Sequence, residues 1–138
     1  MNRFDLDERL IKFAANIIQL AESLPNSPIG NHMKGQIVRS GTSPALNYGE
    51  AQSAESKKDF IHKMSISLKE LRETFVALKI IKYSSLDVIP DLVEKCFIEN
   101  NELISIFVKS IETAKKNKSA VPNDYSYIET TQPKILNR

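Results

Sequence analysis

Basic side chains recur at helical spacing between positions 58 and 79. Lys58, His62, Lys69, Arg72 and Lys79 are separated by four, seven, three and seven residues. On an α-helix these steps keep all five within about 100° of arc, so they form one continuous row, called the basic stripe below. A row of cations matches the repeated negative charge of a phosphate backbone. The basic stripe is therefore the first candidate for a nucleic-acid-binding surface.

The same five residues have a simpler interpretation. Exposed helix faces are commonly rich in lysine, and these cations could pair with acidic residues of a later helix, such as Asp91, Glu94 and Glu102. No aromatic residue lies within the stripe, so base stacking gains no support from it. Phosphate binding and a solvated or ion-paired face both stay open.

A second polar set consists of Arg39, Asn47, Glu50 and Arg72. Asn47 and Glu50 are three residues apart and therefore share one helix face. We expect Glu50 to pair with Arg39 or Arg72 in a structural network between two helices. A general acid–base role would need a second carboxylate or a histidine placed by the spacing, and none is.

No metal or catalytic motif accompanies these sets. His32 and His62 lack a histidine four residues away or a spaced cysteine, so no metal site is expected. A Gly-rich phosphate loop and a Gly-x-Ser-x-Gly elbow are both missing from the sequence. The one cysteine, Cys96, lies in an apolar run and is expected to be a small buried residue. We therefore expect a protein that is not an enzyme and uses no cofactor.

The elements that must position these residues are helices. Apolar residues at alternating steps of three and four predict helices over about 6–24, 29–54, 56–83 and 88–117. Ser56, with Asp59 three residues later, is typical of a capping box and should introduce the third helix. Gly41 permits unusual backbone angles, and Ser43 before Pro44 resembles an N-cap followed by a first helical residue. The second helix is therefore predicted to be kinked or broken there.

Apolar seams predict how these helices pack. The main ones are Leu6, Leu10, Phe13, Ile17, Leu20 and Leu24 in the first helix and Ile61, Met64, Leu68, Leu71, Phe75 and Leu78 in the third. Ile11, Ala14, Ile18 and Ala21 widen the first seam beyond the roughly 100° that one core needs, which favours a subunit interface over a wide core. Short turns predict an all-α, antiparallel up-down-up-down four-helix bundle over residues 1–117. Residues 118–138, with Pro122 and Pro133, are expected to be a tail without regular structure.

Composition limits the class of protein. The chain has 138 residues, enough for one domain, and a net charge of +2, too small to indicate nucleic acid by itself. The charge is segregated: residues 55–83 carry a net +3 and residues 84–113 a net −4, which favours an anionic partner or complementary neighbours.

No apolar run reaches the ~20 residues of a membrane span, and the first residues are polar. With a single cysteine, the expected location is the cytoplasm.

Four stretches together resemble one family. They are the run RSGTSPALNYGEA at 39–51, the runs FIHKM at 60–64 and LKELRET at 68–74, and the opening FDL at 4–6. They are similar to the four-helix-bundle proteins first known from intervening sequences in bacterial 23S rRNA genes, over about residues 4–117. The resemblance implies an antiparallel bundle assembled as a ring-shaped homopentamer, with no established enzymatic activity.

A related branch of that family bears on function. It comprises accessory proteins of diversity-generating retroelements, whose basic barrel works with a reverse transcriptase and nucleic acid. The present chain is only mildly basic. The leading hypothesis is a non-enzymatic homo-oligomer that binds structured RNA or other nucleic acid through the basic stripe. The alternative is a protein-interaction scaffold without a nucleic-acid ligand.

Overall fold

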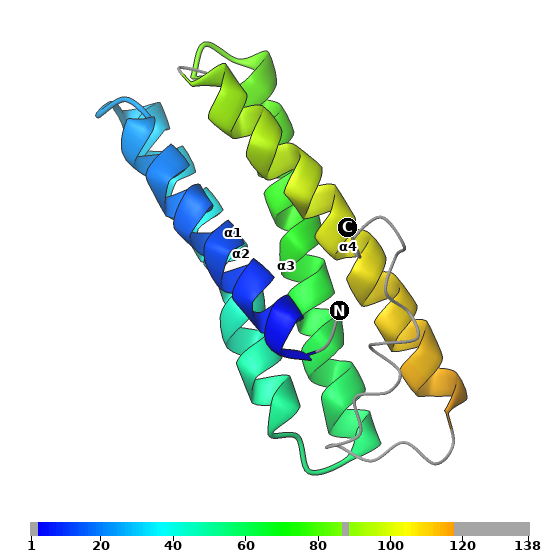
Figure 1. Ribbon diagram of the computed structural model, residues 1–138. Coiled ribbons are helices and arrows are strands. Elements are labelled where there is room, and N and C mark those ends of the chain that lie inside the picture. The colour runs from blue at the N-terminus through cyan, green and yellow to red at the C-terminus, as the bar shows by residue number, and fades with distance from the viewer. Residues whose placement is uncertain (1–2, 87–88, 118–138) are drawn as a thin grey trace.

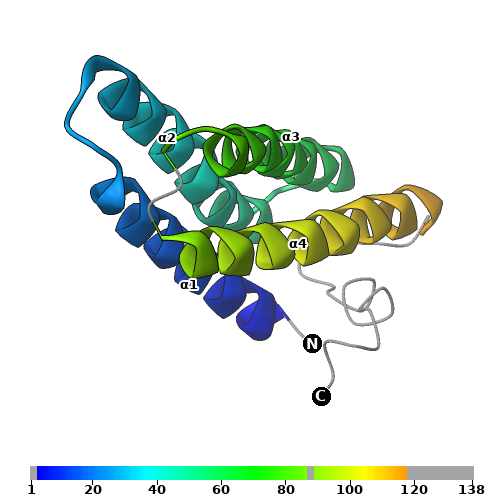
Figure 2. The same cartoon turned by 90° about the horizontal axis from the view of Figure 1, so that it is seen from above.

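The chain folds into four α-helices. The computed structural model describes residues 3–86 and 89–117, which contain α1 (Arg3–Ser23), α2 (Pro28–Gln52), α3 (Lys57–Tyr83) and α4 (Pro90–Lys116) and no strand (Figure 1). Consecutive helices connect at alternating ends of the molecule (Figures 1 and 2). Contacts are extensive between α1 and α2, α2 and α3, and α3 and α4, whereas α1 and α4 touch less. The predicted all-α four-helix fold is confirmed.

Serine caps begin the two central helices. The Ser56 side chain accepts a hydrogen bond from the Asp59 amide at 3.0 Å, as the sequence predicts for the start of α3. The Ser27 side chain accepts from the Gly30 amide at 3.0 Å, and Pro28 follows it in the first turn of α2. Each cap satisfies one of the amides that a helix leaves unpaired at its N-terminus.

The apolar seams supply the core. All six predicted residues of the α1 seam are at most 4% exposed. On α3, Met64, Leu71 and Leu78 are fully buried, but the centre of the buried face is shifted from the predicted seam. Ser67 and Thr74 occupy buried positions there with 0% exposure, because their hydroxyls bond to backbone carbonyls four residues earlier.

The predicted break in the second helix is wrong. α2 continues without interruption from Pro28 to Gln52, with Pro44 inside it. Pro44 cannot donate to the carbonyl four residues earlier, but the Thr42 and Ser43 hydroxyls bond to the Val38 and Arg39 carbonyls at 2.7 Å each. Ser43 therefore bonds back within the helix and does not cap a new helix at Pro44. Whether α2 is kinked stays a prediction.

Gly41 serves packing and not an unusual backbone angle. No described residue, glycine included, has a positive φ. A Cβ at position 41 would lie 2.7 Å from Cγ2 of Ile17, which is 0% exposed. Gly41 therefore lets α2 approach α1 closely.

Two further predictions have a limited outcome. Among the described helices, none has an apolar stretch long enough to cross a membrane. The predicted tail at 118–138 lies outside the described residues.

Candidate nucleic-acid interface

The basic stripe follows the solvent-facing side of α3. Lys58, His62, Lys69 and Arg72 are all exposed. Lys79 is half-buried instead, with its Nζ 5.4 Å from the centre of the Phe75 ring. A cation held over an aromatic face is partly shielded from other charges. The open part of the basic stripe therefore runs from Lys58 to Arg72, about 21 Å at 1.5 Å per residue.

The cations of the stripe are not used in ion pairs. Within residues 3–86 and 89–117, Lys58, Lys69 and Arg72 have no ion pair, and neither has Lys79. Of the α4 acids considered as partners, Glu94 pairs with Lys82 at 3.3 Å and Glu102 lies 3.8 Å from Arg9. Among the described residues, ion pairing with α4 is therefore not seen at these cations, and a solvated face stays open as the alternative to phosphate binding.

Other basic side chains of the bundle do have carboxylate partners. Arg9 donates from Nε to Glu99 at 2.8 Å and its second nitrogen pairs with the same carboxylate, which joins α1 to α4. Lys63, on the side of α3 toward α2, lies 3.5 Å from Glu50. The exposed cations of the stripe differ from these because no carboxylate of a described residue lies within ion-pair distance of them, although the charge of Lys69 acts on nearby Glu73.

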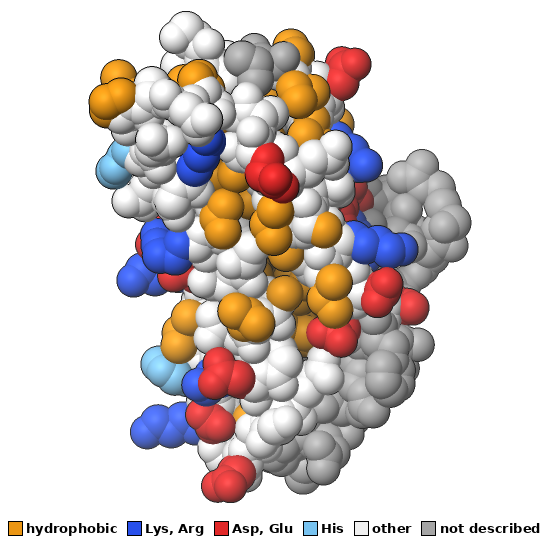
Figure 3. All heavy atoms as spheres, turned by 90° about the vertical axis from the view of Figure 1, so that its left-hand side faces the viewer, with side chains coloured by type: hydrophobic (Ala, Val, Ile, Leu, Met, Phe, Trp, Pro, Cys, Tyr) orange, Lys and Arg blue, Asp and Glu red, His pale blue; other side chains and the backbone are white. Residues whose placement is uncertain are grey.

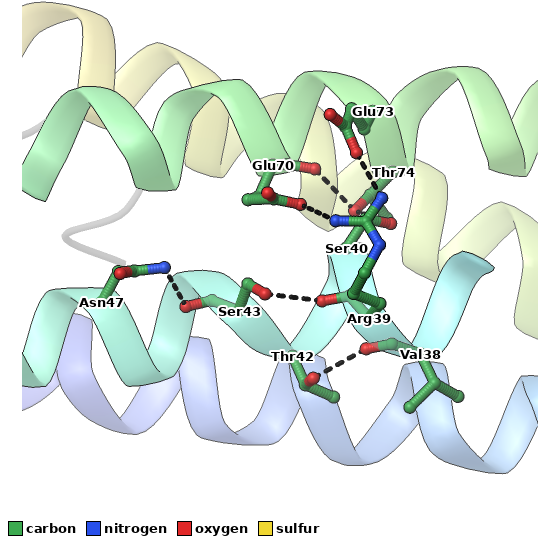
Figure 4. A network of polar contacts seen from close by, with 9 residues as sticks. All are labelled: Val38, Arg39, Ser40, Thr42, Ser43, Asn47, Glu70, Glu73 and Thr74. Carbon is green, nitrogen blue, oxygen red and sulfur yellow. Dashed lines mark hydrogen bonds and ion pairs between the residues drawn. The ribbon is translucent and has the colours of Figure 1, made fainter. Parts of the chain in front are cut away.

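The second polar set is paired differently from the prediction. Arg39 on α2 donates to Glu70 at 2.9 Å and to Glu73 at 2.6 Å, both on α3 (Figure 4). Glu50 contacts Lys63 and not Arg39 or Arg72, and Asn47 donates to the Ser43 carbonyl at 3.1 Å within α2. Arg72 lies in the basic stripe and belongs to no such network. Arg39 does connect two helices, but its partners are Glu70 and Glu73 and not the expected Glu50.

A buried hydroxyl pair lies close to the Arg39 contacts. Ser40 and Thr74, 1% and 0% exposed, are hydrogen-bonded at 2.9 Å between α2 and α3 (Figure 4). The hydrogen bond from Arg39, aided by the charge of Lys69, holds the pKa of Glu73 below its usual value. Glu73 is therefore a carboxylate at neutral pH, with its Oε2 accepting from Arg39 and its side chain 39% exposed. Arg39 and Ser40 therefore connect α2 to α3.

A groove lies beside the stripe, between α2 and α3. It has a volume of about 740 Å³. Its apolar lining comprises Met33, Leu68, Val76, Ala77 and Ile80, and its polar lining includes His32, Gln36, Ser65, Lys69 and Arg72. Sequence reasoning missed this groove because it depends on how two helices pack. In the structure, Val76 and Ile80, which are 55% and 50% exposed, form part of its apolar lining.

Neither metal nor thiol chemistry gains support. The described residues contain no cluster of His, Cys, Asp or Glu that could hold a metal ion. Cys96 is buried, as predicted, and burial raises the pKa of its thiol to about 11. A thiol with that pKa is almost entirely protonated near neutral pH and is a poor nucleophile.

These features define a class of protein: a four-helix bundle with an unpaired basic stripe on one central helix. The model of the 23S rRNA-intervening sequence protein family matches residues 4–116, and the chain belongs to that family. A crystal structure of a protein with unknown function from the S23 ribosomal protein family of Bacteroides thetaiotaomicron VPI-5482 is similar, with 31% identity and a TM-score of 0.72. The similarity covers 78% of this chain and 99% of that one. Among curated proteins, none matches this chain.

Proposed function

We propose that the protein is a non-enzymatic, homo-oligomeric helical bundle that binds structured RNA or another nucleic acid through the basic stripe of α3. The observation that carries this proposal is the absence of ion pairs at Lys58, Lys69 and Arg72, which are exposed along one line of the described part of α3. Unpaired cations retain hydration and counterions that a phosphate backbone displaces, which makes binding favourable and salt-dependent.

Oligomerisation is the second part of the proposal. Ile11 and Ile18 on α1 and Leu46 on α2 are 50%, 43% and 71% exposed. They belong to the α1–α2 face, defined as Ile11, Ile18, Val38, Ala45 and Leu46. On this side of the molecule, apolar side chains gather in a continuous band (Figure 3). An exposed apolar band of this kind is typical of a protein–protein contact. A homopentamer, which the family resemblance implies, would repeat the basic stripe five times and strengthen its local field.

The binding test is a salt titration. Fluorescence anisotropy with a labelled RNA hairpin should give an affinity that falls as salt rises, with a slope of log K against log salt near −0.9 per phosphate contact in duplex and about −0.7 in single strands. Replacing Lys69→Glu and Arg72→Glu together should weaken binding at low salt by at least about tenfold, and the slope should become shallower by roughly 1.4–1.8.

The matched control places the same charge change on α4. Lys95→Glu with Lys109→Glu alters the net charge by the same amount, and both lysines are exposed. If binding depends on the stripe and not on net charge, this variant should retain most of the affinity. Equal loss in both variants, or no binding at low salt by the unmodified protein, would sink the proposal.

A protein-interaction scaffold without nucleic acid is the other candidate function. The apolar α1–α2 face favours it, because such a face can also receive a different protein. The salt titration separates the two: a scaffold without a nucleic-acid ligand would not bind the RNA hairpin, whatever the state of Lys69 and Arg72.

A further inference from the structure

The groove between α2 and α3 opens directly beside two cations of the basic stripe. Lys69 and Arg72 belong to the stripe and also line the groove. A phosphate held by these side chains would therefore lie at the rim of an apolar hollow. In a nucleic acid, the base attached to such a nucleotide is the nearest large group that can enter the hollow.

The lining of the groove suits the faces of a nucleobase. Met33 and Ala77 are each 8% exposed and form its floor, while Val76 and Ile80 rise beside it at 55% and 50% exposure. A base that leaves its stack loses the contacts of its flat faces, and an apolar slot replaces them. The volume of about 740 Å³ leaves ample room for one base.

The polar lining suits the edge of a base. The side chains of Gln36 on α2 and Ser65 on α3 are exposed. Neither side chain has a hydrogen bond to another described residue. An amide side chain both donates and accepts, so it can pair with the hydrogen-bonding edge of an unpaired base. Glu73 also lines the groove, but its carboxylate is engaged by Arg39 at 2.6 Å and so repels a phosphate less.

We infer that the α2–α3 groove receives an unstacked base of the bound nucleic acid, so that the protein prefers single-stranded loops, bulges or ends over continuous duplex. This inference rests on the proposed function and adds the substrate class to it. The apolar groove binds the base, and the adjoining cations bind its phosphates. A continuous duplex presents phosphates to the stripe but no free base to the groove.

The test compares two RNAs and two neutral variants. A 12-nucleotide single strand and the matching duplex are titrated at the same salt concentration, and the single strand should bind about tenfold more tightly. Ile80→Ser removes apolar lining without changing charge, and it should weaken single-strand binding about fivefold, because the exposed half of the isoleucine side chain no longer packs against the base. It should leave duplex binding and the salt slope unchanged.

The matched control is Ile98→Ser on α4. Ile98 is 53% exposed, close to the 50% of Ile80, and it lies outside the groove. This variant should bind both RNAs as the unmodified protein does. Circular dichroism of both variants checks that the helices remain intact.

A direct readout uses 2-aminopurine placed in the single strand. The chain contains no tryptophan, so the emission of the base analogue is free of protein background. Its emission should change on binding to the unmodified protein and to Ile98→Ser, and markedly less with Ile80→Ser.

The failures of the two proposals are distinguishable. Equal affinity for single strand and duplex, with no effect of Ile80→Ser, would overturn the groove inference and leave the basic stripe as a backbone-binding surface. A change in oligomer size caused by Ile80→Ser would also overturn it, since the groove would then be a contact between copies. No binding of either RNA at low salt would overturn the proposed function, and the groove inference with it.

Discussion

At the scale of single residues, Gly41 sets the distance between α1 and α2. The nearest atoms to an added Cβ would be Cγ2, Cγ1 and Cβ of Ile17, at 2.7, 2.9 and 3.1 Å. Ile17 is fully buried and has little room to move. Gly41→Ala should therefore lower the free energy of unfolding by about 1–3 kcal/mol, the usual cost of overpacking a core. Urea denaturation at fixed protein concentration measures the change.

Two other glycines of α2 provide the control for this prediction. Gly35 and Gly49 are exposed, and an added Cβ would meet nothing within 4 Å. Alanine is favoured over glycine in a helix by about 0.8–1.0 kcal/mol, so Gly35→Ala and Gly49→Ala should each stabilise the protein. If Gly41→Ala were stabilising as well, the close approach of the two helices would not depend on Gly41.

Residue contacts between helices were the least predictable from the sequence. Arg39 on α2 reaches Glu70 and Glu73 on α3, a pairing that the sequence did not predict. Spacing describes one helix at a time, whereas the partner across an interface depends on how two helices are aligned. The Arg9–Glu99 pair, 90 residues apart, was missed for the same reason. Asn100 was missed as a core residue because asparagine side chains are mostly exposed, whereas this one is 0% exposed and its amide has no hydrogen-bond partner among the described residues.

At the scale of elements, local signals located the helices well. Ser56, Pro90 and the steps of three and four placed three of the four helices within a few residues of their observed bounds. The break expected near Pro44 fails for a physical reason. A serine–proline pair resembles a helix start, but the flanking hydroxyls of Thr42 and Ser43 bond back within the helix and α2 continues through it.

The cap of α3 gives a prediction at this scale. Ser56→Ala removes the oxygen that accepts from the Asp59 amide and should destabilise the protein by about 1 kcal/mol. Ser105→Ala, an exposed position inside α4, should be neutral or slightly stabilising because alanine favours the helix. Urea midpoints of the two variants, compared at equal protein concentration, measure the difference. A Ser56→Ala midpoint equal to that of Ser105→Ala would show that the cap contributes nothing.

At the scale of the whole molecule, the basic stripe and the α1–α2 face lie on different parts of the bundle. The basic stripe follows α3, whereas the apolar band covers the side formed by α1 and α2 (Figure 3). Copies that associate through the α1–α2 face would therefore leave the stripe open to a ligand. Association and nucleic-acid binding are then separate properties, and each can be removed without the other.

This separation gives the last prediction. Ile18→Glu with Leu46→Glu puts two charges on the α1–α2 face, where burial of an unpaired carboxylate in an interface is costly. Multi-angle light scattering at micromolar concentration should give a larger species for the unmodified protein and a smaller one for the variant. The variant should still bind an RNA hairpin, but more weakly, because fewer stripes act together. Ile98→Glu on α4 is the control and should leave the size of the oligomer unchanged. If Ile98→Glu alone caused dissociation, the contact between copies would lie on α4. A monomeric unmodified protein would refute oligomerisation.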